Sequence, residues 1–171
     1  MTVDIDATYD VACAFLASAY DALALTDAGP PGRAYVNPGE APMDCCGELV
    51  VWTQTLADQQ SQIPEPKQLR HGKQPLLTII VRATRCAPTM KEEGGKLRFP
   101  DPADLQAAAK MVEQDGWALW NHISWSLRHG ELKKICAGAY RDGAVKLTPQ
   151  GGCVGWTFTF RYPLEGSLLG T

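Results

Sequence analysis

The chain has 171 residues, of which 45% are hydrophobic and 20% are charged, an ordinary composition for a globular domain. At this length about 70% of the unfolded surface can be buried, so a single domain spanning residues 1–171 can form its own core. The net charge of −3 argues against a dedicated nucleic-acid surface, and no window holds the ~20 apolar residues needed to cross a bilayer.

The N-terminal segment is acidic at first and then becomes apolar. The opening MTVDIDATYD lacks the positive flank of a signal peptide, so we expect folding in a reducing cytoplasm. Residues 8–26 carry apolar side chains at spacings of three and four, which predicts a helix. The apolar positions form two stripes, one with Tyr9, Cys13, Leu16, Tyr20 and Leu23, the other with Val11, Phe15, Ala19 and Ala22. Both sides of such a helix must be covered, and we expect a sheet and another subunit to cover them.

Three strands are predicted next, at residues 33–36, 48–56 and 75–86, because these segments are rich in strand-forming residues and lie between turn-forming runs. The residues of the third strand expected to face the core are Leu77, Ile79, Val81 and Ala83. Residues 57–74, between the second and third strands, are long and polar for a hairpin connection. Loops of this length are usually functional or disordered.

A second long loop, residues 87–100, leads into the strongest helix signal of the chain. Asp101 is a suitable N-cap and Pro102 fits the first helical position. The helix is expected to end near His129, where a basic last turn is followed by glycine. We expect a kink at Gly116, because glycine inside a helix costs ~1 kcal/mol relative to alanine.

The C-terminal third is predicted to form strands at residues 134–140, 144–150 and 153–164. The last of these has the cleanest alternation, with large apolar residues at every second position. The tail, residues 165–171, is expected to be frayed or borrowed by a neighbour. The order of elements predicts an α+β domain, with two main helices packed on a mostly antiparallel or mixed sheet of about four to six strands.

The cysteines allow several kinds of chemistry. A metal site would draw on Cys45 or Cys46, together with Cys86, Cys153 and His71. It would require three strand ends to converge, and the adjacent pair lacks the C-x₂-C spacing of zinc sites. A disulfide between Cys46 and Cys86 would require close Cα atoms and an oxidant, and a catalytic cysteine would require a base, which nothing local supplies. We expect the cysteines to be small buried apolar residues at strand ends.

Other signatures of catalysis are lacking in the sequence. His122 and His129 are seven apart and share a helix face, but no H-E-x-x-H pattern accompanies them. Trp117, Trp120 and Trp125 follow helical spacing, which favours core or subunit contacts over a cofactor site. We therefore expect no catalytic residue, no cofactor and no bound metal. The abundant aromatics and long polar loops indicate a protein that works by contacting other proteins.

Five segments in order resemble one known family. GRAYVNPGE, DCCGELVVW, VRATRCAPT, DLQAAA and GGCVGWTFTF resemble segments of small virion proteins from tailed phages of actinobacterial hosts. Those proteins are assigned as tail terminators or head-to-tail connector proteins. The resemblance covers roughly residues 32–160.

The resemblance implies a structural virion protein of the head–tail junction, assembled in the host cytoplasm and not an enzyme. Tail terminators form a ring, commonly a hexamer, that caps the tail tube, stops its polymerisation and joins the head. The implied partners are further copies of the chain, the major tail tube protein and the head-to-tail stopper or connector, while genomic DNA passes through without specific binding. The nearest alternative is a head-completion or stopper protein of the neck. The alternative from another class is a small cytoplasmic metal-binding or thiol protein.

We expect the loops at 57–74 and 87–100 to project from the ring and to contact these partners, because both are long, polar and charged. The simpler alternative is that both loops are only solvated. The candidate interaction residues are Lys67, Arg70, Lys91, Glu92, Glu93, Lys96 and Arg98.

Overall fold

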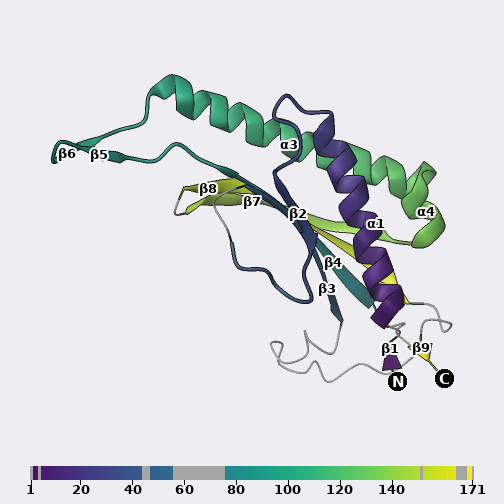
Figure 1. The fold of residues 1–171 in the computed structure, drawn as a ribbon. Coiled ribbons are helices and arrows are strands. Elements are labelled where there is room, and N and C mark those ends of the chain that lie inside the picture. Colours follow the sequence, from purple (N-terminus) through teal and green to yellow (C-terminus); the bar gives the residue numbers. More distant parts are fainter. Residues whose placement is uncertain are drawn as a thin grey trace, which may run out of the picture.

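A five-stranded mixed sheet forms the centre of the fold (Figure 1). The computed structural model describes residues 2–3, 5–43, 47–55, 76–150, 152–164 and 169–170. The strands of the sheet are β2 (Arg33–Val36), β3 (Glu48–Thr55), β4 (Leu76–Cys86), β7 (Tyr140–Gln150) and β8 (Cys153–Pro163). Their order is β2-β3-β4-β8-β7, with β2 parallel to β3 and every other neighbour antiparallel. The predicted α+β domain with a mixed sheet is confirmed.

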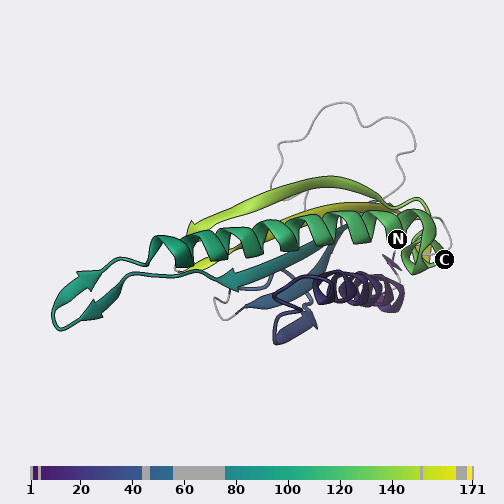
Figure 2. The same ribbon diagram turned by 90° about the horizontal axis from the view of Figure 1, so that it is seen from above.

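Two long helices cover one face of this sheet, as Figures 1 and 2 show. They are α1 (Ile5–Ala24) and α3 (Pro102–His129), and the short α4 (Glu131–Ile135) follows α3. Helix α1 packs on β2, β3 and β4, whereas α3 packs on β8 and on α1. The predicted start of α3 is confirmed, because the side chain of Asp101 accepts a hydrogen bond of 2.8 Å from the backbone N–H of Ala103.

The main core lies between the helices and the sheet. All four residues of β4 predicted to face it are buried: Leu77, Ile79, Val81 and Ala83. Phe15 of α1 meets Phe160 of β8 with ring centroids 5.0 Å apart. Of the two apolar stripes on α1, the one through Phe15 is buried, whereas Tyr9 and Tyr20 of the other are exposed.

The opposite face of the sheet carries a smaller cluster and a buried ion pair. The cluster consists of Ala41, Val50, Trp52 and Ile80. Arg82 reaches from β4 to Glu48 on β3 at 3.0 Å, and its Nη2 also donates to the backbone oxygens of Ala41 and Pro42. Tyr35 donates a hydrogen bond of 2.8 Å to Glu48, and burial together with this bond raises the pKa of Tyr35. These contacts attach the segment after β2 to the sheet.

The predicted strand at residues 134–140 is wrong. Its first residues belong to α4, because Leu132 is buried in the core and anchors a helical turn there. A turn follows, with Gly138 at a φ of +87°, and β7 begins only at Tyr140. The local pattern was ambiguous because the segment is short.

The two ends of the chain meet in a small second sheet. β1 (Thr2–Val3) pairs antiparallel with β9 (Leu169–Gly170), so these two residues of the tail are paired within the chain and are not frayed (Figure 1). Among the described helices, none has an apolar stretch long enough to cross a membrane.

Candidate functional site

The segment predicted as a loop at 87–100 is a projecting β-hairpin, called the arm from here on. β5 (Lys91–Glu93) pairs antiparallel with β6 (Lys96–Arg98). Gly94 and Gly95 form the turn with φ of +60° and +75°, as a two-residue type I′ connection requires. The arm extends past the N-terminal end of α3 and away from the sheet (Figures 1 and 2). It differs from the predicted loop because this glycine pair makes a tight hairpin possible.

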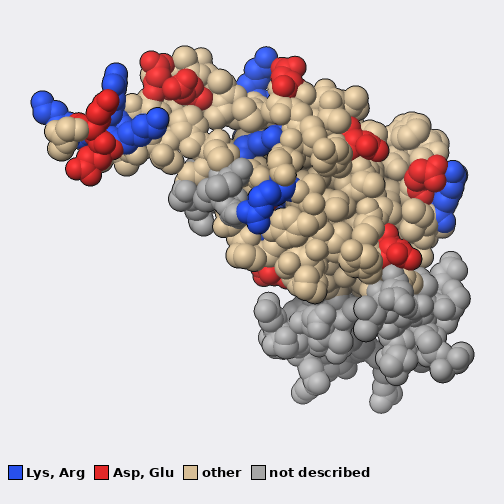
Figure 3. All heavy atoms as spheres, viewed as in Figure 1, with Lys and Arg blue, Asp and Glu red and all other residues tan. Residues whose placement is uncertain are grey.

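One face of the arm is charged. Residues opposite each other in an antiparallel pair share a face, so the register of β5 and β6 assigns the sides. The charged face carries Lys91, Glu93, Lys96 and Arg98. Across it, Arg98 Nη1 lies 3.0 Å from Glu93 Oε2, and both side chains remain largely in solvent. Figure 3 shows charges of both signs crowded on the arm, whereas most of the visible face of the domain is uncharged.

The other face of the arm is apolar apart from one acid. Leu97 lies opposite Glu92 and is 67% exposed. Met90 precedes β5 and Phe99 follows β6, and they are 55% and 75% exposed. If the alternation of the strands continues by one residue, both lie on the side of this pair. Three large apolar side chains therefore face solvent on a segment that projects from the domain.

Five of the seven predicted interaction residues lie on this arm, and all five are exposed: Lys91, Glu92, Glu93, Lys96 and Arg98. The other two, Lys67 and Arg70, lie outside the described residues. The prediction did not separate Glu92 from the remaining charges, since only the register of the hairpin assigns it to the apolar face.

The cysteines do not behave as one group. Cys86 and Cys153 are paired neighbours on β4 and β8. The Cys46–Cys86 disulfide was an alternative and not the prediction, and its partner Cys46 lies outside the described residues. Cys153 is disulfide-bonded, which corrects its assignment as a mere packing residue. Cys45, Cys46 and His71 lie outside the described residues. Within the described ranges, no three potential ligands gather as a metal site would require.

Cys136, at the end of α4, does match the expected packing role. It is buried, and its thiol donates a hydrogen bond of 3.0 Å to the backbone oxygen of Leu132. Burial raises the pKa of Cys136 to about 12. The thiolate is the reactive form, so this cysteine is unsuited to nucleophilic chemistry.

The two helical histidines share a face of α3, as predicted. His122 and His129 lie on either side of the exposed Trp125, with ring centroids 6.5 and 6.2 Å from it. They form an aromatic patch near the C-terminal end of the helix, in which Trp125 and His129 are exposed and His122 is half-buried.

An aromatic groove lies between the middle of α3 and the strands β8 and β7. Its volume is about 280 Å³, and its lining is apolar except for Glu113. The other lining residues are Gly116, Trp117, Trp120, Ala144, Trp156 and Phe158. Trp117 forms an exposed wall and is 63% accessible to solvent. We call this hollow the tryptophan groove.

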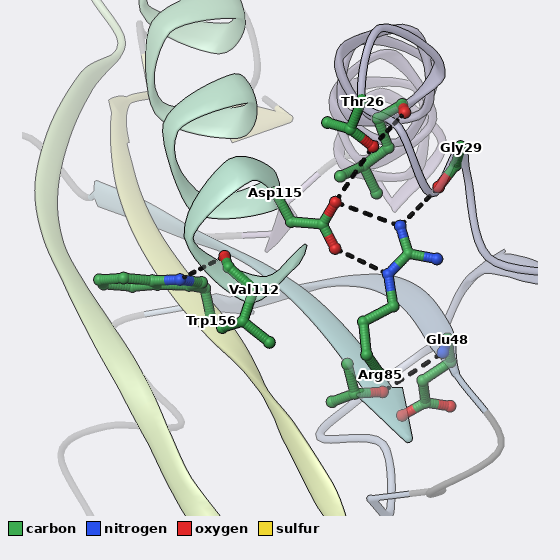
Figure 4. A network of polar contacts seen from close by, with 9 residues as sticks. Thr26, Gly29, Glu48, Arg85, Val112, Asp115 and Trp156 are labelled. Carbon is green, nitrogen blue, oxygen red and sulfur yellow. Dashed lines mark hydrogen bonds and ion pairs between the residues drawn. The ribbon is translucent and has the colours of Figure 1, made fainter. Parts of the chain in front are cut away.

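The floor of the tryptophan groove is fixed by ring contacts and one hydrogen bond. Trp156 stacks on Phe158 with centroids 5.9 Å apart, and Phe158 lies 6.1 Å from Trp120. The indole N–H of Trp156 donates to the backbone oxygen of Val112 at 3.0 Å (Figure 4). Gly116 allows this close approach, and α3 passes through it as one continuous helix.

The rim of the tryptophan groove is basic on the β7 side. Arg141 lies 3.8 Å above the ring of Trp120 and donates to Ser124. Lys146 lies 6.0 Å from the ring of Trp156 and forms an ion pair with Glu113. The groove thus combines an apolar floor with two cations at its edge.

A buried ion pair holds α3 against β4 beside the groove, as Figure 4 shows. Arg85 Nε donates to Asp115 Oδ2 at 2.7 Å, and Arg85 Nη2 donates to the backbone oxygen of Gly29 at 2.5 Å. Thr26 donates to the other carboxylate oxygen of Asp115 at 3.2 Å. The pair therefore connects β4, α3 and the turn after α1, and it has a structural role.

Sequence reasoning missed the tryptophan groove, although part of its signal was present. Trp117 and Trp120 follow Gly116 on α3, and Trp156 is part of the alternation of β8. Only the packing of α3 on β8 brings the two segments together. Comparison of the chain with known protein families, with curated proteins and with solved structures finds no match.

Proposed function

We propose that this chain is a structural protein of the phage head–tail junction, a tail terminator that assembles into a ring, commonly of six copies. The ring would cap the tail tube, stop its polymerisation and join the tail to the head connector. Its role is to bind other proteins, without covalent chemistry or a cofactor. The five ordered sequence segments support the identity of the family, and the surfaces described above support the mode of action.

The observation that carries this proposal is the arm. A two-stranded hairpin is marginally stable in water by itself, and this one presents a charged face and an apolar face to solvent. A hairpin of this kind would gain stability when both of its faces contact other protein chains. In the proposed ring, the charged face of the arm contacts the tail tube protein or the connector.

Deletion of residues 91–96 tests this role. The deletion removes most of the arm but none of the residues of the main core, so the thermal unfolding midpoint of the purified protein should change little. Head–tail joining should be lost, and micrographs of the mutant phage should show separate heads and tails. A substitution at the exposed Leu25, remote from the arm in sequence, serves as the surface control. A normal yield of joined virions from the deletion would refute the role of the arm.

A knockout distinguishes the terminator from the neighbouring stopper role. Loss of a terminator removes the signal that ends tube growth, so overlong tails should appear. Loss of a stopper should leave tails of normal length beside empty or leaking heads. Electron micrographs of the knockout lysate measure tail length directly, and normal tails would overturn the assignment as a terminator.

A metal-binding or thiol protein is the competing class. Elemental analysis of the purified protein should find no stoichiometric metal. A thiol titration of the native protein should find no thiol that reacts unusually fast, in line with the raised pKa of Cys136. Stoichiometric zinc would favour the competing class.

A further inference from the structure

The apolar face of the arm has no cover within the described fold. Leu97 and Phe99 are about two-thirds and three-quarters exposed, although side chains of this kind gain free energy when buried. The arm points past the N-terminal end of α3 (Figure 2). The arm therefore extends beyond the rest of the described fold (Figure 2).

The tryptophan groove is an apolar surface of the complementary kind. It lies near Gly116, which is 14 residues along α3 from Pro102, or roughly 20 Å at 1.5 Å per residue. The arm leads away from the start of the helix, so it does not reach the groove of its own chain (Figures 1 and 2). A second chain has no such constraint.

We propose that the apolar face of the arm binds in the tryptophan groove of a second copy of this chain. Leu97 and Phe99 would contact the aromatic floor and Trp117. The single charge on this face of the arm is Glu92, and the rim of the groove offers the cation Arg141, whereas Lys146 already pairs with Glu113 of the groove. The two surfaces thus match in apolar character, and the charge of Glu92 is opposite to that of Arg141 at the rim.

The contact joins two different patches, so it is heterologous. Each copy offers one arm and one groove, and a chain of such contacts closes into a ring when the rotation between neighbours allows it. The closed ring rests on the function proposed above, whereas the pairwise contact does not. The charged face of the arm stays outside the contact and remains available to other proteins.

Two variants of the full chain test the contact, with mass measured by analytical ultracentrifugation over a series of concentrations. L97E/F99E removes the apolar face of the arm, and W117E places a charge on the exposed wall of the groove. All three positions are exposed, so both variants should keep the unfolding midpoint of the wild type. Each variant alone should sediment as a single chain under conditions in which the wild type forms multimers. The variant K96A, on the charged face, should assemble like the wild type.

Mixing the two variants gives the sharpest result. The intact arm of W117E can enter the intact groove of L97E/F99E, but no further contact can form. An equimolar mixture should therefore contain a species with the mass of two chains and nothing larger. A mixture that stays at the mass of one chain would overturn the proposal.

The failures of the two proposals are distinguishable. If both variants form multimers of wild-type size, the arm-to-groove contact is wrong, while a ring function can stand on another contact. If the mixture forms the two-chain species but the knockout phage has normal tails, the contact holds and the terminator function is wrong. A wild type that sediments as one chain at every concentration would overturn the contact.

Discussion

Gly116 shows how a single residue sets the geometry of the groove. A Cβ atom at this position would lie 2.5 Å from Nε1 of Trp156 and 2.7 Å from its Cε2. The indole occupies the space that any larger residue would need, and its hydrogen bond to Val112 fixes it there. The glycine is thus required for packing and not for flexibility.

The substitution Gly116→Ala tests this interpretation, because the two views predict opposite changes in the free energy of unfolding. In an open helix interior, alanine would stabilise the protein by ~1 kcal/mol relative to glycine. Here the displaced indole should reverse the sign, with a loss of about 1 to 3 kcal/mol in the free energy of unfolding. Urea unfolding measures the change. The control is Gly32→Ala, where an added Cβ meets nothing within 4 Å and little change is expected.

The contrast between Cys86 and Cys136 gives a second test at single residues. Cys86 is exposed, whereas Cys136 is buried and its pKa is raised to about 12. Iodoacetamide at neutral pH should therefore label Cys86 in the native protein and leave Cys136 unlabelled until denaturant is added. Mass spectrometry of the digested protein locates the labels. Equal labelling of both thiols in the native state would show that Cys136 is accessible.

At the scale of elements, the Arg85–Asp115 pair joins three parts of the fold. Its side chains are 12% and 4% exposed, so both charges are largely removed from water. The partners lie on β4 and α3, and the same network reaches the turn after α1 through Gly29.

Asp115→Leu leaves the guanidinium of Arg85 without its carboxylate, and it should cost about 3 to 5 kcal/mol of unfolding free energy. The double variant R85M/D115L removes both charges and should recover most of that loss. The exposed pair of the arm is the matched control, since Glu93→Ala should cost less than about 1 kcal/mol. Chemical denaturation of the variants provides the numbers. If Asp115→Leu costs no more unfolding free energy than Glu93→Ala, the buried pair contributes little to stability.

The elements that the sequence predicted well are those with strong local signals. The start of α3 at Pro102 follows from Asp101, and the buried side of β4 follows from its alternation. The segment 134–140 was misassigned because strand-forming residues there were outweighed by the burial of Leu132. The arm differs from the loop predicted at residues 87–100 because Gly94 and Gly95 form a hairpin turn between β5 and β6.

At the scale of the whole molecule, the burial of the Cys136 thiol should make the free energy of unfolding depend on pH in the alkaline range. The pKa of Cys136 is raised from 9.0 to about 12, so between these values the folded state holds a proton that the unfolded state has released. The free energy of unfolding should therefore fall as pH rises above 9, by about 1.4 kcal/mol per pH unit from this group at most. The raised pKa of Tyr35 acts in the same direction at higher pH.

The measurement is urea unfolding at several pH values between 8 and about 11.5, for the wild type and for Cys136→Ala. The wild type should lose stability more steeply than the variant across this range. If the unfolding free energy falls equally steeply with pH in both proteins, Cys136 does not contribute. If it rises with pH, the predicted direction of the effect is wrong.

The sequence by itself determined the class of fold, the cap of α3 and the alternating core of β4 and β8, because these follow from local propensity and periodicity. It also placed a charged, accessible segment at residues 87–100. Only the tertiary structure decided which face of the arm is apolar, and only the packing of α3 on β8 assembled the tryptophan groove. The physical reason is that the pairing of β5 with β6 fixes the two sides of the arm, whereas the packing of α3 on β8 joins residues about 40 positions apart, which no local pattern encodes.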